Sequence, residues 1–242
     1  MSTIGINTLV YKEKLDAGES QAALLSDIQS HDVQVAEIRR EYVNGDLSEI
    51  RRRADELGLE LYYSVPEPIA CGFAVNPDLE TYLTEAAILG ATHLKFNIGT
   101  LGAGASSESV QNAVSKFDGT VTIENDQTPA NGTLASTVGA AAAGITGYTM
   151  DLGNWYWQKE DPEAALAVLD PSMSVLHLKN VTVDEKGPKT VLLDDGLINW
   201  KKFVRAAGTR PVILEYPMQS EEISGEVAKL KNIVNEKEQK NV

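Results

Sequence analysis

The stretch Gly147–Trp157, GYTMDLGNWYW, begins as a short apolar run and ends in a polar, aromatic loop. Asp151 stands where the apolar run ends. One acid in such a place is most simply a turn-forming residue. The pattern recurs, however, in three other strand-like runs, which end at Glu124, His177 and Glu215. This repetition predicts a shared site at the carboxyl ends of several strands.

Short β-branched runs alternate with helical patterns along the whole chain. The strand-like runs cover residues 4–10, 33–38, 59–65, 93–97, 120–124, 148–151, 174–178 and 211–215. The helical patterns cover 19–30, 47–57, 76–89, 108–117, an Ala-rich stretch ending at 144, 162–169, 199–206 and 220–234. Strict alternation predicts a parallel sheet with right-handed helical crossovers.

Eight strand–helix units are the number that closes a (β/α)₈ TIM barrel, so we predict an α/β barrel that forms one domain over residues 1–242. The alternative is an open doubly wound sheet, which usually carries a Gly-rich phosphate-binding turn after its first strand. No G-x-G-x-x-G motif follows residues 4–10, which favours the barrel.

The composition is that of a soluble globular protein, with 43% hydrophobic and 23% charged residues. The net charge of −14 argues against nucleic acid and against anionic membranes as partners. A single cysteine, Cys71, excludes an intrachain disulfide and favours a cytoplasmic location. We expect no signal peptide and no membrane span, since no apolar run approaches 18 residues.

In a TIM barrel the carboxyl ends of all strands meet at one face. Three carboxylates and an imidazole therefore converge there, and repulsion would protonate some of the acids unless a cation compensates them. One nitrogen and three oxygen ligands suit Mn²⁺ first, with Mg²⁺, Co²⁺ and Zn²⁺ as alternatives. The alternative is four ordinary polar residues at strand ends. The metal ligands that we predict are Glu124, Asp151, His177 and Glu215.

The chain resembles the xylose isomerase-like TIM-barrel superfamily of sugar isomerases and epimerases. The resemblance rests on an ordered set of motifs: EIRRE, TIEN, D-x-G-N, LHLKN, DDGLINW and ILEYP. It implies a divalent metal held by the four residues just named, and proton transfer by Glu124 and Glu215. One departure is Asn154, where sugar epimerases often carry a His that contacts substrate. An Asn can form hydrogen bonds with a substrate but cannot shuttle a proton.

The expected reaction removes a proton next to a carbonyl and passes through an enediolate that a metal stabilises. The first hypothesis is an isomerase or epimerase of a small keto-sugar or polyol-derived ketone. The second is a dehydratase of the inosose or dehydroshikimate type, and the third is a non-catalytic sugar-binding barrel. The expected partner is a small carbohydrate, and barrels of this type often pair as homodimers. A multi-zinc DNA-repair barrel is disfavoured by the acidic charge and by only three His.

Strand alternation adds further candidates, because residues two apart point the same way. Lys179 follows His177 in this manner, Lys95 and Asn97 end their strand together, and a surface position is the alternative for each. We predict that substrate contacts come from Lys179, Asn154, Lys95, Asn97, Arg39, Glu41, Asp195 and Trp155. For Arg39 and Glu41 the alternative is a structural ion pair, and for Asp195 it is a turn. For Trp155 the alternative is a place in the wall of the barrel mouth.

Overall fold

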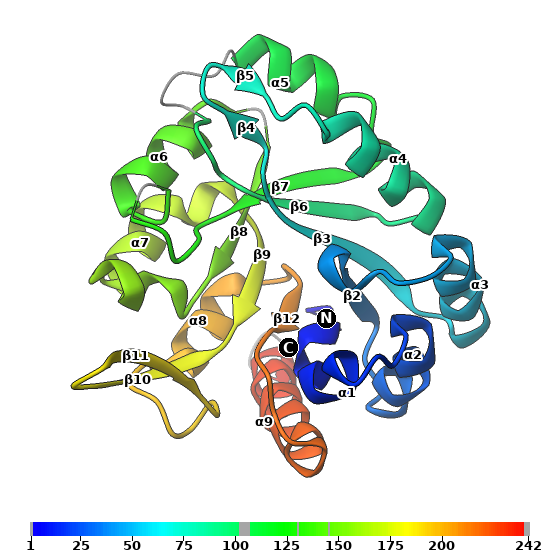
Figure 1. Ribbon diagram of the computed structural model, residues 1–242. Coiled ribbons are helices and arrows are strands. Elements are labelled where there is room, and N and C mark those ends of the chain that lie inside the picture. The colour runs from blue at the N-terminus through cyan, green and yellow to red at the C-terminus, as the bar shows by residue number, and fades with distance from the viewer. Residues whose placement is uncertain (1, 102–106, 130, 145, 240–242) are drawn as a thin grey trace.

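The computed structural model describes residues 2–101, 107–129, 131–144 and 146–239. Within these ranges, eight parallel strands close into a barrel in the order β1-β12-β9-β8-β7-β6-β3-β2, and helices surround it (Figure 1). The barrel strands are β1 (Ile4–Asn7), β2 (Val35–Arg39), β3 (Glu60–Pro68), β6 (His93–Asn97), β7 (Thr120–Glu124), β8 (Gly147–Asp151), β9 (Met173–Leu178) and β12 (Val212–Leu214). The predicted TIM barrel is confirmed.

The helices follow the strands as the sequence pattern predicts, after a short extra helix, α1 (Lys12–Asp16). They are α2 (Gln21–Ser30), α3 (Leu47–Leu57), α4 (Leu79–Leu89), α5 (Ser107–Val114), α6 (Leu134–Ala142), α7 (Pro162–Leu169), α8 (Trp200–Ala207) and α9 (Ser220–Gln239). Local chemistry sets their ends. Asp161 accepts a hydrogen bond from the Glu163 backbone N–H and caps α7, while Gly58 ends α3 with a φ of 68°. No helix of the described residues has the length and apolar character that crossing a membrane requires.

The sequence pattern predicts neither a strand nor a helix between strand 174–178 and helix 199–206, but the structure has two strands there. β10 (Asn180–Asp184) and β11 (Gly187–Val191) form an antiparallel hairpin that extends away from the barrel (Figure 1). Its sequence alternates apolar and polar residues, and Gly187 supplies a φ of 111° at the turn. A smaller hairpin, β4 (Ala70–Cys71) with β5 (Ala74–Val75), follows β3.

Short 3-10 helices follow three of the strands, β1, β2 and β8, and a fourth joins α7 to β9. They are η1 (Thr8–Tyr11), η2 (Arg40–Tyr42), η3 (Asn154–Gln158) and η4 (Asp170–Ser172). The first strand consequently ends at Asn7, three residues earlier than the apolar run suggests. Asn7 itself causes this, because its side chain accepts a hydrogen bond from the Leu9 backbone N–H and starts η1.

Apolar side chains form two separate clusters. The large cluster lies between the barrel and its helices, and the small one consists of Val35, Tyr62, Val175 and Ile213. These four residues alternate in phase with the polar residues that meet inside the barrel, so they fill the barrel interior below the polar groups. The barrel interior is therefore charged at its carboxyl-terminal end and mostly uncharged below it, where His93 stacks on Tyr62 and the Thr149 hydroxyl donates to that of Thr122.

Gly5 lets this inner cluster pack. A Cβ on Gly5 would lie 2.4 Å from Cδ1 of Ile213 and 2.8 Å from Cβ of Val35. The Ile213 atom ends a flexible side chain, but the Cβ of Val35 is fixed to the β2 backbone. A side chain at position 5 would therefore force β1 and β2 apart.

We expect Gly5→Ala to lower the free energy of unfolding by about 1–3 kcal/mol, the usual cost of overpacking a core. Gly139→Ala is the matched control, because a Cβ on Gly139 in α6 meets nothing within 4 Å. That change should raise stability by about 0.5–1 kcal/mol through helix propensity. Urea denaturation followed by circular dichroism measures both, and equal stability of Gly5→Ala and the wild type would contradict this packing account.

Candidate functional site

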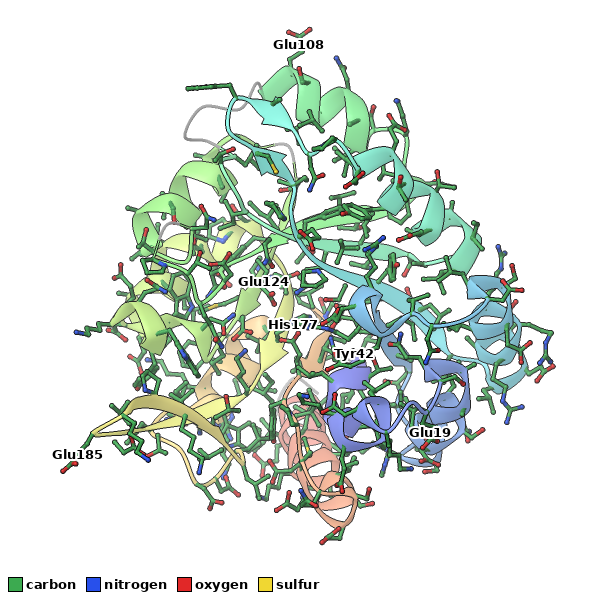
Figure 2. The ribbon with its side chains drawn as sticks, viewed as in Figure 1. Glu19, Tyr42, Glu108, Glu124, His177 and Glu185 are labelled. Atoms are coloured by element: carbon green, nitrogen blue, oxygen red, sulfur yellow. The ribbon has the colours of Figure 1, made fainter. Side chains whose placement is uncertain are left out.

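Four buried ligand residues meet at the carboxyl end of the barrel. Glu124 ends β7, Asp151 ends β8, His177 lies near the end of β9, and Glu215 directly follows β12. One ligand atom from each lies within 4.8 Å of the ligand atoms of the other three. Figure 2 places Glu124 and His177 toward the middle of the barrel. The structure thus brings together the four residues that the sequence singles out as metal ligands.

His177 is fully buried and turns its two ring nitrogens toward different partners. Nδ1 lies 2.7 Å from Oε1 of Glu124 and 3.1 Å from Oε2 of Glu215. Nε2 lies 3.0 Å from Oε2 of Glu37. Burial by itself lowers the pKa of His177, but the surrounding carboxylates, led by Glu37, outweigh it and raise that pKa well above its ordinary value.

Three basic side chains also reach this cluster, each on a different carboxylate. The pairs are Lys95 Nζ with Glu124 Oε2 (2.5 Å), Lys179 Nζ with Asp151 Oδ2 (2.5 Å) and Arg39 Nη1 with Glu215 Oε1 (2.7 Å). Both lysines are buried, with 3% and 8% of their surface exposed. Buried charges need such partners, because leaving one unpaired costs several kcal/mol.

Basic side chains therefore compensate part of the carboxylate charge, for which the sequence pattern indicates a divalent cation. Ion pairs connect five carboxylates, those of Glu37, Glu41, Glu124, Asp151 and Glu215. The three basic residues of the preceding paragraph neutralise three of these charges. With a neutral imidazole, the carboxylates outnumber the basic side chains, and the excess negative charge favours a bound cation.

Two carboxylate oxygens of the cluster lack well-formed hydrogen bonds. Among the described residues, no hydrogen bond of normal geometry reaches Oε1 of Glu124 or Oδ2 of Asp151, although both atoms are buried. Their nearest cations, on His177 and Lys179, are close but poorly aligned. Free lone pairs on hard oxygens are what a divalent ion requires, so the residues present fit a metal such as Mn²⁺, Mg²⁺, Co²⁺ or Zn²⁺.

Burial and ion pairing shift the pKa values of the carboxyl groups in opposite directions. Burial raises the pKa of Asp151 to about 7, even though Lys179 favours the ionised form. Burial also opposes ionisation of Glu124, but Lys95 and His177 together outweigh it and lower the pKa of Glu124. In Glu215, His177, Lys95 and Lys179 together overcome burial and hold the pKa well below its ordinary value. The acids of the cluster are thus electrostatically unequal.

A cavity of about 320 Å³ opens above the cluster. It is lined by Leu9, Arg39, Pro66, Lys95, Asn97, Glu124, Asp126, Gln127, Thr128, Asp151, Asn154, Lys179 and Glu215. Most of these side chains are polar, and three are cationic. Of the predicted substrate contacts, the cavity wall includes Arg39, Lys95, Asn97, Asn154 and Lys179.

The other predicted contacts lie elsewhere. Glu41 forms an ion pair with Arg39 behind the cavity wall and is about one third exposed. Trp155 is completely buried in the core, where its indole nitrogen has no hydrogen bond within the described structure. Asp195 is exposed on the loop between β11 and α8. The structure does not bring Glu41, Trp155 or Asp195 to the cavity.

Asn154 lines the cavity, but protein groups already occupy its amide. Its Oδ1 accepts a hydrogen bond from Nε2 of Gln127 at 3.0 Å, and its Nδ2 donates one to the Asn125 carbonyl at 2.8 Å. Asn154 is 5% exposed. These contacts tie the loop after β7 to η3, so Asn154 holds the cavity wall in place.

Solved structures share this architecture over almost their full length. A xylose isomerase domain protein from Planctomyces limnophilus has a TM-score of 0.70 at 14% identity, with 99% of this chain and 98% of that chain covered. The chain has the xylose isomerase-like TIM-barrel fold.

Two further solved structures share the fold. A probable 3-DHS dehydratase involved in petrobactin synthesis in Bacillus anthracis matches with a TM-score of 0.69 at 14% identity, covering 96% of this chain and 99% of that one. The IOLI protein, solved with a bound zinc atom, matches with a TM-score of 0.71 at 11% identity, covering 97% and 98%. Neither a scan of protein-family models nor a search of curated sequences found a match.

In this xylose isomerase-like barrel, sequence reasoning missed the importance of an asparagine. Asn125 accepts hydrogen bonds from the Asp151 backbone N–H at 3.0 Å and the Tyr148 hydroxyl at 2.6 Å. Its Nδ2 donates to the Asp151 carbonyl at 3.0 Å. Asn125 thereby fixes the end of β8. The motif TIEN contains it, but nothing in one sequence separates this role from an ordinary turn. Asp126, Gln127 and Thr128 of the cavity wall were missed for the same reason.

Two glycines make room for residues after His177. A Cβ on Gly153 would lie 2.7 Å from Cγ and 2.9 Å from Cε of Lys179. A Cβ on Gly196 would lie 2.2 Å from Oδ1 of Asn180, whose amide bonds the Leu193 and Ile198 backbones. The motifs D-x-G-N and DDG thus owe their glycines to close packing against β9 and β10.

We expect Lys95→Met to lower the free energy of unfolding by about 3–5 kcal/mol, because it leaves Glu124 charged, buried and without its ammonium partner. Adding Glu124→Gln to that variant should recover most of the loss. The comparison is Lys116→Met, which breaks an exposed pair with Glu80 and should cost less than about 1 kcal/mol. Urea unfolding of chelator-treated protein measures all three, and equal losses for Lys95→Met and Lys116→Met would refute a buried pair.

Proposed function

We propose that this protein is a divalent-metal-dependent isomerase or epimerase that acts on a small keto-sugar or polyol-derived ketone. The observation that carries the proposal is the buried ligand set of Glu124, Asp151, His177 and Glu215 beneath a polar cavity. The fold supports it, since a xylose isomerase domain protein has the same barrel.

The four ligand residues would hold the metal through three carboxylates and Nδ1 of the imidazole. A bound divalent cation supplies positive charge, which stabilises the negative charge that develops on substrate oxygens when a proton leaves the neighbouring carbon. Lys95 contacts Oε2 of Glu124 and Arg39 contacts Oε1 of Glu215, while the Gly153 and Asn154 backbone N–H groups donate to Oδ1 of Asp151. These contacts fix the directions in which the ligands point. Rigid ligands of this kind favour a preorganised site.

Proton transfer is assigned to Glu124 and Glu215. They approach the cavity from β7 and from the end of β12, and in the barrel order two strands, β8 and β9, separate those elements. Two carboxylates on different sides of a bound ketone suit removal of a proton at one position and its return at another. Asn154 takes no part in the proton transfer, because an amide cannot carry the proton.

A small polyhydroxylated substrate agrees with the cavity. Its volume of about 320 Å³ is at the small end of ligand pockets. Asn97, Gln127 and Thr128 offer amide and hydroxyl groups along the wall, which suit hydrogen bonds with sugar hydroxyls. A small carbohydrate is accordingly the partner that we propose, while a homodimer, a cytoplasmic location and the absence of nucleic acid and membrane partners stay predictions.

A dehydratase on the same barrel is the second candidate, and one observation favours it. The fold is that of a probable 3-DHS dehydratase. The proton abstraction is the same in both readings. They differ in the next step, because elimination expels a β-hydroxyl as water instead of returning the proton.

Metal binding is the first test. We expect the chelator-treated protein to bind about one Mn²⁺ or Co²⁺ per chain by calorimetry. His177→Ala and Glu124→Gln should each weaken binding more than about 100-fold, since even residues behind metal ligands contribute 10–100-fold. Glu85→Gln, which removes a carboxylate that pairs with Arg40 outside the cluster, is the control. Retention of full affinity by both ligand variants would show that the site is misassigned.

Deuterium exchange is the second test. We expect the metal-loaded protein to exchange the proton next to the carbonyl of at least one compound in a panel of ketoses, inososes and dehydroshikimate in D₂O. Glu215→Gln should slow that exchange by about 10²–10⁴-fold, the usual contribution of a general base. Growth of enone absorbance without epimer formation would identify the dehydratase. Binding of a ketone without any exchange would instead leave a non-catalytic sugar-binding barrel.

A further inference from the structure

Two buried polar residues lie beside the ligand cluster without lining the cavity. Asn7 ends β1 and is fully buried, and Glu37 in β2 is 2% exposed. Neither is among the residues that line the 320 Å³ cavity, so neither is placed to touch a ligand there. Burying a carboxylate at this depth costs free energy. Any effect of Glu37 on a ligand in the cavity must therefore act through the residues that it contacts.

The orientation of the Asn7 amide is fixed by a backbone group. The Leu9 backbone N–H donates a hydrogen bond of 2.8 Å to one atom of that amide. A backbone N–H only donates, so the accepting atom is Oδ1 and the other is the NH₂ group. That NH₂ lies 2.6 Å from Oε2 of Glu37 and 3.4 Å from Oε1 of Glu215. Asn7 is therefore a donor to Glu37.

Glu37 connects this donor to the imidazole. The same atom, Oε2, lies 3.0 Å from Nε2 of His177. Carboxylates face both ring nitrogens, and in this structure Nδ1 forms the hydrogen bond, at 3.1 Å to Oε2 of Glu215, while the Nε2 contact lacks hydrogen-bond geometry. With a cation held by Glu124 and Glu215, Glu37 is the carboxylate left to accept the proton of the neutral ring, which would then lie on Nε2. The lone pair of His177 is then left on Nδ1, which faces Glu124 and Glu215.

We propose that Asn7 and Glu37 are positioning residues, which set the tautomer and the ring orientation of His177 so that Nδ1 binds the metal. The inference rests on the metal-dependent function proposed above. In the barrel order, β1 and β12 lie between β2 and β9, so the contact of Glu37 with His177 crosses the barrel interior. A carboxylate behind a histidine ligand fixes its ring and raises its basicity.

The test compares Co²⁺ affinity by calorimetry across variants of the full-length, chelator-treated protein. Glu37→Met removes the acceptor at nearly constant size and should weaken binding about 10–100-fold. Glu37→Asp keeps a carboxylate and should recover part of that loss. Asn7→Asp keeps the acceptor for the Leu9 N–H but removes the donor to Glu37, and it should weaken binding less than Glu37→Met. Glu85→Gln, outside the cluster, should bind as the wild type does.

A second measurement reports the tautomer directly. The chain has only three His, so long-range ¹⁵N–¹H spectra of the zinc-loaded, histidine-labelled protein contain three imidazoles. In the wild type we expect a slowly exchanging, downfield Nε2–H proton on His177 with Nδ1 as the metal ligand. Glu37→Met should shift that proton upfield and speed its exchange with solvent. A proton found on Nδ1 in the wild type would overturn the proposal.

The outcomes separate this inference from the proposed function. If the wild type binds Co²⁺ and folded Glu37→Met binds it within twofold of Glu85→Gln, Glu37 is a structural residue and the positioning role is refuted. Should Glu37→Met fail to fold by circular dichroism, Asn7→Asp and Glu37→Asp decide by the same criterion. If the wild type binds no divalent metal, the proposed function fails and the positioning role fails with it.

Discussion

The pairing of unlike charges inside the barrel is the constraint on which the rest of the site depends. Charged groups removed from water persist only with partners, and here each of three carboxylates has its own basic side chain. The partners come from different strands, so their contacts require the strand register that closes the barrel. Fold and site are thus mutually dependent: the barrel makes the pairs meet, and the pairs occupy the space that an apolar core would otherwise fill.

Much of the fold was predictable from the sequence, because alternating β and α patterns with eight repeats leave few topologies. The strands 93–97 and 120–124 were predicted with their observed bounds. What escaped prediction depends on side chains that act locally. Asn7 ends β1 early through its hydrogen bond with Leu9, and the β10–β11 hairpin is short, with only its first residues buried. Neither feature produces the long periodic signal on which sequence patterns depend.

The candidate site was predictable to a similar depth. Strand ends identified the convergence of Glu124, Asp151, His177 and Glu215, and strand parity correctly brought Lys95 and Lys179 to the cavity wall. Parity alone does not say how far a side chain reaches or whether a loop folds over it. Trp155 therefore lies in the core and Asp195 is exposed to solvent, although both were predicted to contact substrate. Glu37, which was not predicted, contacts the imidazole of His177. Such contacts cross the barrel and join strands that are not neighbours.

The small apolar cluster of Val35, Tyr62, Val175 and Ile213 has a consequence for how ligands enter and leave the cavity. It fills the barrel below the charged groups, so the cavity has a floor and opens in one direction only. Any molecule that binds there arrives and departs by the same route. Two such molecules must exclude each other, and whatever leaves competes for the opening with whatever comes next. Competition between substrate and product therefore follows from the packed base of the barrel, whichever groups recognise the ligand.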